Sequence, residues 1–413
     1  MASPLEALGR PLVFEVTDDD GADLDAPDPR LGQAHRARMR ALDTMQKEAL
    51  VTRTGAGGTW RLASDEGEYF DGDDVAPAPL ALLTAGMVCS YATAVRALAA
   101  ERGVDLGGFT LAQDSYYTVS GSLLAGTMRG GALSPDLAAR VSGDRGVDAA
   151  TLRDLVEAAT ERSAVHGILT GEHPSRFALS RDGRRIGRGD DADRGDAVAP
   201  PDGAAESPDP FAVVDRDAPE RDPPLLVRTG DSIEDRSAAE TAPFGDYGPD
   251  DPRTDDRTLR VRANCSVAAD GAKTVEMLFD NPAATIFELR SDAPPGRGGQ
   301  GRAPDAASLV AAGVGFCFMT QAARYAEESA DEELTDLRIV QDTHFSAGGP
   351  SDGGQGDDAG AGRAAPVETH VSVGTPAGDA FAREVLDAAA EMCFAHALFG
   401  TPLDDPTVSI GVD

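Results

Sequence analysis

The residues best suited to chemistry are two cysteines and a histidine in the second half of the chain. Cys317 lies inside a long apolar segment, and Cys393 follows 76 residues later in the motif Cys-Phe-Ala-His, which ends at His396. Two such thiols can act as a redox pair, because the thiolate of one attacks a peroxide and the second condenses with the resulting sulfenic acid. A single cysteine in an apolar helix is usually a core residue, but a recurring pair favours thiol chemistry.

The first half carries the same layout with one substitution. Cys89 lies in a similar apolar segment, and 74 residues later Ser163 opens the motif Ser-Ala-Val-His, which ends at His166. A Ser-Asp pair precedes each cysteine by nearly the same interval, at residues 64–65 and 291–292. These matched landmarks predict an internal duplication in which only the second copy keeps this pair of thiols.

Charge and composition limit the possible partners. The chain has 413 residues, enough for two or three domains, and a formal net charge of −34. Such a charge repels nucleic acid and anionic lipid, and salt must screen its self-repulsion. Lys47 and Lys273 are the only lysines among 37 basic residues. An acidic surface with arginine in place of lysine indicates a halophilic protein of a high-salt, haloarchaeal type of cytoplasm.

Several other classes of protein are disfavoured. The N-terminus has no basic region followed by an apolar core, so we expect a cytoplasmic protein without a cleaved signal. The uncharged stretch at 306–323 approaches the length of a membrane span, but its polar residues and glycines favour a buried core helix. The four cysteines show no zinc-binding spacing and no sign of a disulfide scaffold, so no metal or cofactor is expected.

The chain divides into four segments. Residues 1–47 are predicted to form an arm with a helix at 32–46, residues 48–186 and 257–413 form the two repeats, and 187–256 is an acidic linker rich in proline and glycine. The spacing of apolar residues predicts two strands around a glycine-rich turn within 48–61, and single strands at 109–119, 123–129, 176–186, 257–268, 272–279, 284–290, 336–346, 365–374 and 407–412. It predicts one helix that Pro77 and Pro79 open and Gly103 ends, with an apolar part at 80–98, and further helices at 148–162, 304–327 and 377–397. This order of elements indicates an α+β fold.

A cysteine in an Ala- and Gly-rich central helix, followed about 75 residues later by Cys-x-x-His, resembles the OsmC/Ohr family of hydroperoxide reductases. The resemblance covers roughly residues 48–186 and 257–413. It implies that each repeat is a curved antiparallel sheet packed around its cysteine helix. It also implies that the two repeats form a pseudo-dimer within one chain, which is monomeric or forms a homodimer.

The resemblance assigns roles to residues of the second repeat. Cys317 corresponds to the peroxidatic cysteine, Cys393 to the resolving cysteine, and His396 to the histidine of the family's motif. In the family, an arginine from an N-terminal strand of the partner subunit activates the peroxidatic thiol. In this chain that arginine is expected to be Arg53 or Arg61, reaching Cys317 from the other repeat.

The first repeat departs from the family pattern. Ser163 stands where the resolving cysteine belongs, so Cys89, Ser163 and His166 are expected to form a degenerate second site without an internal disulfide. Cys265, on a predicted strand with no counterpart in the first half, is expected to be structural.

The expected function is therefore a thiol-dependent peroxidase of the antioxidant stress response. Its partners would be a small organic hydroperoxide and a dithiol reductant, with no nucleic acid and no membrane. The alternative is a non-catalytic relative that binds a small apolar ligand or a partner, or a redox or stress sensor. The distance between the two sulfurs discriminates between these possibilities, because a disulfide requires close approach.

Overall fold

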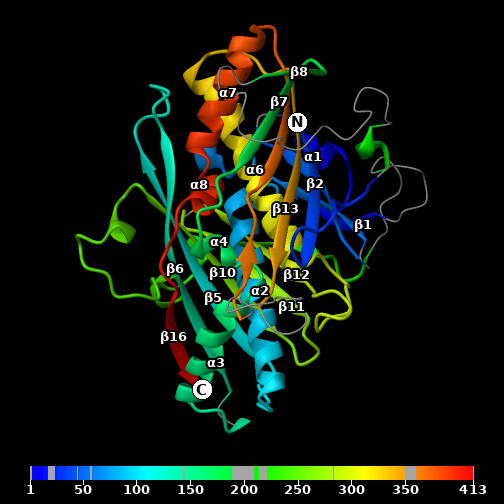
Figure 1. Ribbon diagram of the computed structural model, residues 1–413. Coiled ribbons are helices and arrows are strands. Elements are labelled where there is room, and N and C mark those ends of the chain that lie inside the picture. The colour runs from blue at the N-terminus through cyan, green and yellow to red at the C-terminus, as the bar shows by residue number, and fades with distance from the viewer. Residues whose placement is uncertain are drawn as a thin grey trace.

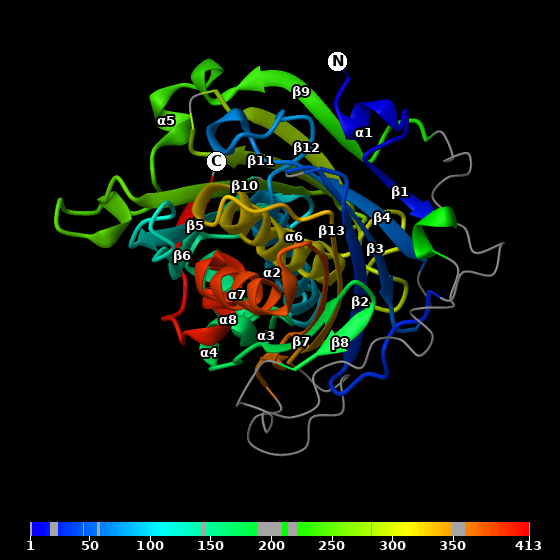
Figure 2. The same ribbon diagram turned by 90° about the horizontal axis from the view of Figure 1, so that it is seen from above.

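Two mixed sheets enclose a central pair of long helices. The computed structural model describes residues 2–16, 24–43, 45–55, 58–142, 145–187, 209–213, 221–281, 283–348 and 360–412. Helices α2 (Pro79–Glu101) and α6 (Ala306–Arg324) pack against each other between the sheets (Figure 1, Figure 2). The architecture is α+β, which confirms the fold class predicted from the order of the elements.

The first sheet combines strands from both halves of the chain. Its order is β1 (Val13–Val16), β4 (Thr59–Ser64), β3 (Lys47–Arg53), β2 (Gln33–Ala41), β13 (Asp336–Ser346), β15 (Glu368–Gly374), β7 (Arg176–Arg181) and β8 (Arg184–Ile186), with β14 (Arg363–Ala364) beside β13. The junction between the halves is the antiparallel pair β2 and β13, and β15 pairs with β7 in parallel.

The second sheet has a corresponding strand order, in which strands of the second half take the places that strands of the first half take in the first sheet, and the reverse. Its order is β9 (Leu226–Ser232), β12 (Thr285–Ser291), β11 (Lys273–Phe279), β10 (Thr258–Val267), β5 (Phe109–Ser120), β6 (Arg129–Val141) and β16 (Thr407–Val412). Here β10 and β5 join the halves, and β6 pairs with β16 in parallel. The sheets are therefore mixed and shared, whereas a separate antiparallel sheet was expected for each repeat. The parallel pairs arise because the last strands of each half join the sheet beside a strand of the other half, β7 beside β15 and β16 beside β6.

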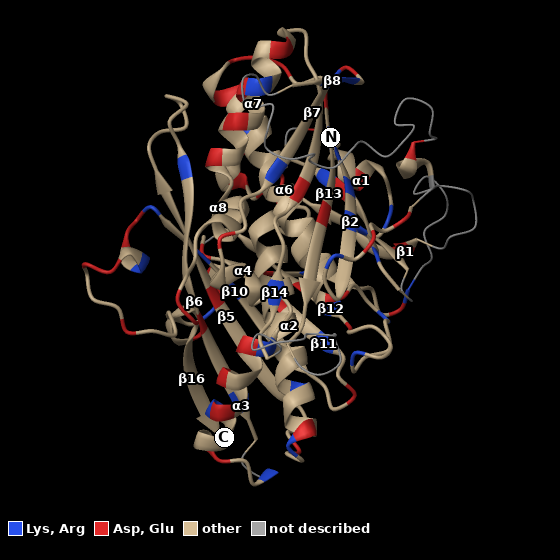
Figure 3. Cartoon of the chain, viewed as in Figure 1, with Lys and Arg blue, Asp and Glu red and all other residues tan. Residues whose placement is uncertain are grey.

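Shorter helices cover the remaining faces. They are α1 (Pro4–Ala7), α3 (Ala149–Arg162), α4 (Gly167–Thr170), α5 (Ala238–Thr241), α7 (Gly378–Met392) and α8 (Phe394–Gly400), with single turns at Glu68–Phe70, Pro210–Val213, Ile233–Asp235, Pro252–Thr254 and Tyr325–Ser329. Charged side chains lie mainly on loops and outer surfaces, and α2 and α6 carry few of them (Figure 3). Both helices are long and apolar enough to cross a membrane, but 78% and 94% of their most apolar windows are buried inside the protein.

The two central helices cross at glycines. A Cβ atom on Gly86 would lie 2.7 Å from the carbonyl oxygen of Ala306, and one on Gly313 would lie 2.7 Å from the backbone nitrogen of Leu83. Neither backbone atom can move without displacing a buried helix. The crossing therefore requires glycine on both helices, and it fixes how deeply each cysteine helix is buried.

Matched hydrogen bonds hold the loop that leads into each central helix. Ser64 Oγ donates to the carbonyl of Pro77 at 2.8 Å, and Ser291 Oγ donates to the carbonyl of Pro304 at 2.8 Å. The carboxylate after each serine accepts two backbone N–H groups at 3.1–3.2 Å, from residues 73 and 75 in the first half and from residues 300 and 302 in the second. The repeated Ser-Asp pair thus serves the same structural purpose twice.

Two elements differ from the sequence-based expectation. Residues 33–41 form strand β2 rather than part of a helix at 32–46, because their arginines face ion-pair partners such as Asp342 on β13 instead of open solvent. The strand expected at 123–129 is absent from the described structure there, and β6 occupies 129–141 instead. Pro135 is tolerated inside β6 because the pairing with β5 shifts register at this point.

The linker and the arm both contribute to the sheets. Much of the predicted linker at 187–256 lies outside the described residues, but its apolar run forms β9, with Leu225 and Leu226 buried. The predicted arm at 1–47 supplies β1 and β2 of the first sheet.

The glycine crossing gives the first testable prediction. Gly313→Ala should lower the free energy of unfolding by about 1–3 kcal/mol, although alanine favours helices, because its methyl group would meet backbone. Gly315→Ala is the matched control, since the nearest atoms there belong to the flexible end of Met39. Denaturant unfolding in molar salt measures the free energy of unfolding of both variants. Equal stability of the two variants would contradict a close crossing.

Candidate dithiol site

Cys317 and Cys393 lie side by side in the interior. Cys317 is in the middle of α6, and Cys393 occupies the break between α7 and α8, where its extended backbone ends one helix and starts the next. Their sulfurs are 3.4 Å apart, with Cys393 donating to Cys317, and both are reduced thiols. Because a disulfide bond is about 2.05 Å long, a small movement would join them. The predicted helix at 377–397 is thus interrupted at the residue that turns its thiol toward α6.

The surroundings keep Cys393 protonated. Burial and the neighbouring Cys317 sulfur raise the pKa of Cys393, so Cys393 stays protonated and acts as the hydrogen-bond donor. His396 Nδ1 lies 3.1 Å from Cys393 Sγ. Burial lowers the pKa of His396 to about 3, so its imidazole is neutral, and its ring packs against Phe177 and Phe318.

A buried cation that interacts electrostatically with Cys317 is Lys47, to which the sequence analysis assigned no role. Lys47 is 1% exposed at the start of β3, and its ammonium donates to the carbonyl of Met45 at 2.5 Å. Burial lowers its pKa, and the carboxylates of Glu66 and Asp65 and the Cys317 sulfur oppose that shift. The sequence signal that could have pointed to Lys47 is the rarity of lysine, since only two of the 37 basic residues are lysine.

The structure places the two predicted arginines elsewhere. Arg61 is 1% exposed and pairs with Glu48 at 2.8 Å. Arg53 lies 3.4 Å from Asp305, the residue that caps the N-terminus of α6. Burial alone would raise the pKa of Asp305, but His35 and Arg53 outweigh it and hold the pKa below its usual value. None of the contacts described for either arginine includes Cys317.

The corresponding residues of the first half are arranged differently. Ser163 Oγ lies 2.7 Å from Ser90 Oγ, so it bonds to the residue after Cys89. His166 Nε2 lies 3.2 Å from Asp405, and its pKa is lowered by burial, which outweighs that carboxylate. Cys89 is buried within α2, and Cys265 is buried on β10.

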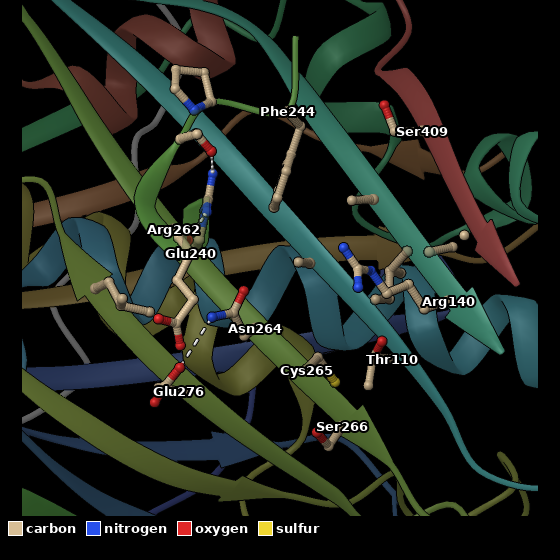
Figure 4. Close-up of a pocket in the computed structure, with 18 of the residues that line it drawn as sticks. Thr110, Arg140, Glu240, Phe244, Arg262, Asn264, Cys265, Ser266, Glu276 and Ser409 are labelled. Carbon is tan, nitrogen blue, oxygen red and sulfur yellow. Dashed lines mark hydrogen bonds between the residues drawn. The ribbon is translucent and has the colours of Figure 1, made fainter. Parts of the chain in front are cut away.

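A pocket on the outer face of the second sheet is lined by several charged side chains that form ion pairs. It encloses about 730 Å³ beneath the segment that carries Phe244 (Figure 4). Arg262 pairs with Asp114 at 2.6 Å, while Glu276 binds Arg236 and accepts from Asn264 at 3.0 Å. Because these charges are paired, the buried thiols are the better candidates for chemistry.

Comparison of the chain with protein-family models, with curated proteins and with solved structures finds no match. Among the residues that the structure describes, no group of three or more His, Cys, Asp or Glu side chains is placed to hold a metal ion. The function must therefore be argued from the thiols and their neighbours.

Burial of His396 leads to a prediction about pH. Histidine has a pKa of about 6.5 in the unfolded chain, against about 3 in the folded protein. As the pH falls below 6.5, the histidine of the unfolded chain therefore takes up a proton while His396 of the folded protein does not. The contribution of neutral His396 to the free energy of unfolding is complete above pH 6.5, and it decreases by about 1.4 kcal/mol for each pH unit below that value. His396→Phe keeps the ring packing and should remove this slope between pH 6.5 and 5.

Unfolding of the wild type and the variant at a series of pH values measures the effect. His173→Gln is the matched control, since this histidine is only partly buried. Stability curves that run parallel for wild type and His396→Phe would contradict a neutral, buried His396.

Proposed function

We propose that the chain is a thiol-dependent hydroperoxide reductase related to the OsmC/Ohr family, with Cys317 and Cys393 as the working pair. The observation that carries the proposal is the 3.4 Å approach of two buried sulfurs, of which Cys393 is the protonated donor. Lys47 supplies a positive charge beside Cys317. A thiol that receives a hydrogen bond and faces an ammonium group is the better nucleophile of the two.

Every proton and bond in the proposed reaction can be assigned to Cys317, Cys393, Lys47 and the two substrates. The Cys317 thiolate attacks the distal oxygen of an organic hydroperoxide, the O–O bond breaks, and the alkoxide leaves as an alcohol after taking a proton from Lys47. Cys393 then attacks the sulfenic acid on Cys317, its proton leaves with the hydroxide as water, and a disulfide forms. A dithiol reductant of the cytoplasm returns both thiols, with Lys47 regaining its proton from solvent.

Internal duplication is part of the proposal. Three matched features support it: the strand orders of the two sheets, the hydrogen bonds of the two Ser-Asp pairs, and the lysines that begin β3 and β11. Lys47 belongs to the first half but serves Cys317 of the second, as the activating residue of the resembling family comes from a partner subunit. The chain would thus be a pseudo-dimer, either monomeric or paired with a second copy, with lysine in place of the expected arginine.

A second candidate is favoured by one observation. Cys317 is only 2% exposed and Cys393 is fully buried, so a peroxide needs an opening to reach them. A non-catalytic protein that binds an apolar ligand or partner, or a slow redox or stress sensor, would need no such opening. Reaction with peroxide separates these functions.

Oxidation should join the proposed pair. One equivalent of an organic hydroperoxide should produce a Cys317–Cys393 disulfide, detected by peptide mass mapping, and Cys317→Ser should prevent it. Cys393→Ala should instead accumulate sulfenic or sulfinic acid on Cys317, because the oxidised thiol has lost its partner. If Cys317 stays unmodified in excess peroxide, the chain is not a reductase at this pair and the binding function takes its place.

The identity of the activating cation can be tested separately. Lys47→Met should slow alkylation of Cys317 at pH 7 by about tenfold or more, because the thiolate loses the nearby charge. Arg53→Met is the matched control and should change this rate little, since Arg53 contacts Asp305. Site-resolved mass spectrometry with a small alkylating agent gives both rates. A larger effect from Arg53→Met would restore the arginine assignment.

A further inference from the structure

A cavity lies between the two halves of the chain, beside the serines of the first half. It encloses about 590 Å³ between α2 and the loop at 293–298. Arg96 of α2 donates to the carbonyl of Gly298 at 2.6 Å, so the loop is held against the helix. The polar residues Ser90, Ser163 and Lys273 and the small residue Ala293 line the cavity. The position of these four residues is therefore set by elements of both halves.

Lys273 brings hydrogen-bond donors that the chain does not use. It is 4% exposed at the start of β11, and its ammonium donates to the carbonyl of Gly271 at 3.2 Å. A lysine ammonium has three N–H donors. Among the residues that the structure describes, Lys273 forms no other hydrogen bond and no ion pair. Since a buried charge requires a partner, Lys273 can bind an anion in the cavity.

The carboxylates that line the described part of the cavity are already paired. Glu101 binds Arg162 at 2.7 Å. Asp305 lies 3.3 Å from His35 and 3.4 Å from Arg53. The positive charge of Lys273 is therefore left for a molecule from outside the chain.

The matched site of the other half shows what such a molecule would replace. Counted from the two cysteines and the two Ser-Asp pairs, Phe318 corresponds to Ser90 and Glu66 corresponds to Ala293. Phe318 is fully buried and packs against two other rings, and the buried carboxylate of Glu66 interacts electrostatically with Lys47. At one site the chain supplies a ring and a carboxylate, whereas at the other two small residues leave the space open.

We propose that this cavity binds a small aromatic carboxylate, whose charged group pairs with Lys273 and whose ring packs on the apolar wall. That wall is supplied by Ala94, Ala97, Leu98, Pro294 and Pro295. The hydroxyls of Ser90 and Ser163 lie 2.7 Å apart, and the one that accepts keeps an O–H group for the ligand. Ser163 thus has a use that a resolving cysteine would not serve. Binding requires no thiol, so the inference does not rest on the proposed function.

3-Phenylpropionate and its neutral analogue 3-phenylpropanol test the site in the full-length, reduced chain in molar salt. Isothermal titration calorimetry should show saturable binding of the acid and about tenfold weaker binding of the alcohol, which cannot pair with Lys273. Lys273→Met should weaken binding of the acid about tenfold and leave the alcohol nearly unchanged. Arg140→Met is the matched control and should change neither affinity, since Arg140 is an exposed residue of the outer pocket.

A second pair of variants tests the comparison between the halves. Ala293→Glu introduces the residue that corresponds to Glu66, and its carboxylate should compete with the acid for Lys273. It should therefore weaken binding of the acid about tenfold more than Ala293→Gln, which has nearly the same size and no charge. If Lys273→Met fails to fold, this comparison decides alone.

The outcomes separate this inference from the proposed function. No saturable binding at millimolar ligand, or equal affinities for the acid and the alcohol, would refute the carboxylate site and leave the peroxide reaction of Cys317 untouched. Cys317→Ser should bind the acid as the wild type does, so a chain that consumes no peroxide could still confirm the site. Loss of acid binding in Cys317→Ser but not in Lys273→Met would overturn the assignment to this cavity.

Discussion

The crossing of two largely apolar helices is the constraint on which the rest of the structure depends. Helices α2 and α6 approach so closely at Gly86 and Gly313 that backbone meets backbone, and each must then be covered on its remaining sides. The strands of one half do not provide that cover alone, because each sheet runs across the boundary between the halves. The cysteines carried by these helices are consequently held at the centre of one shared core.

A thiolate in such a core needs a cation, and the kind of cation matters. The chain uses arginine for nearly every basic position, yet both lysines are buried, and each interacts electrostatically with the cysteine of a central helix. Arginine stays charged under all ordinary conditions, whereas a buried lysine can release its proton. A lysine can therefore stabilise a thiolate and also protonate a leaving alkoxide. Under the proposed function, this double capacity would account for Lys47 in a chain that otherwise avoids lysine.

The sequence predicted those elements and contacts that depend on local pattern and on the spacing of residues. The central helices and most strands follow from apolar periodicity, and the proximity of Cys317 and Cys393 follows from their motif. Lys47 was assigned no role because it lies in the first half and the cysteine with which it interacts lies in the second. Periodicity within one segment contains no information about such contacts. Strand β2 was mistaken for a helix because its arginines suggest a solvated face, whereas they meet ion-pair partners contributed by β13.

The proposed thiol pair gives the two halves of the chain different properties. Cys317 and Cys393 both belong to the second half, so under the proposed function their disulfide would tie the central helix α6 to the break between α7 and α8. The first half has Ser163 at the position that corresponds to Cys393, and Ser163 bonds to Ser90 on α2 instead. A disulfide of this kind therefore cannot form on α2, and oxidation of the Cys317 pair would act on only one of two matched central helices.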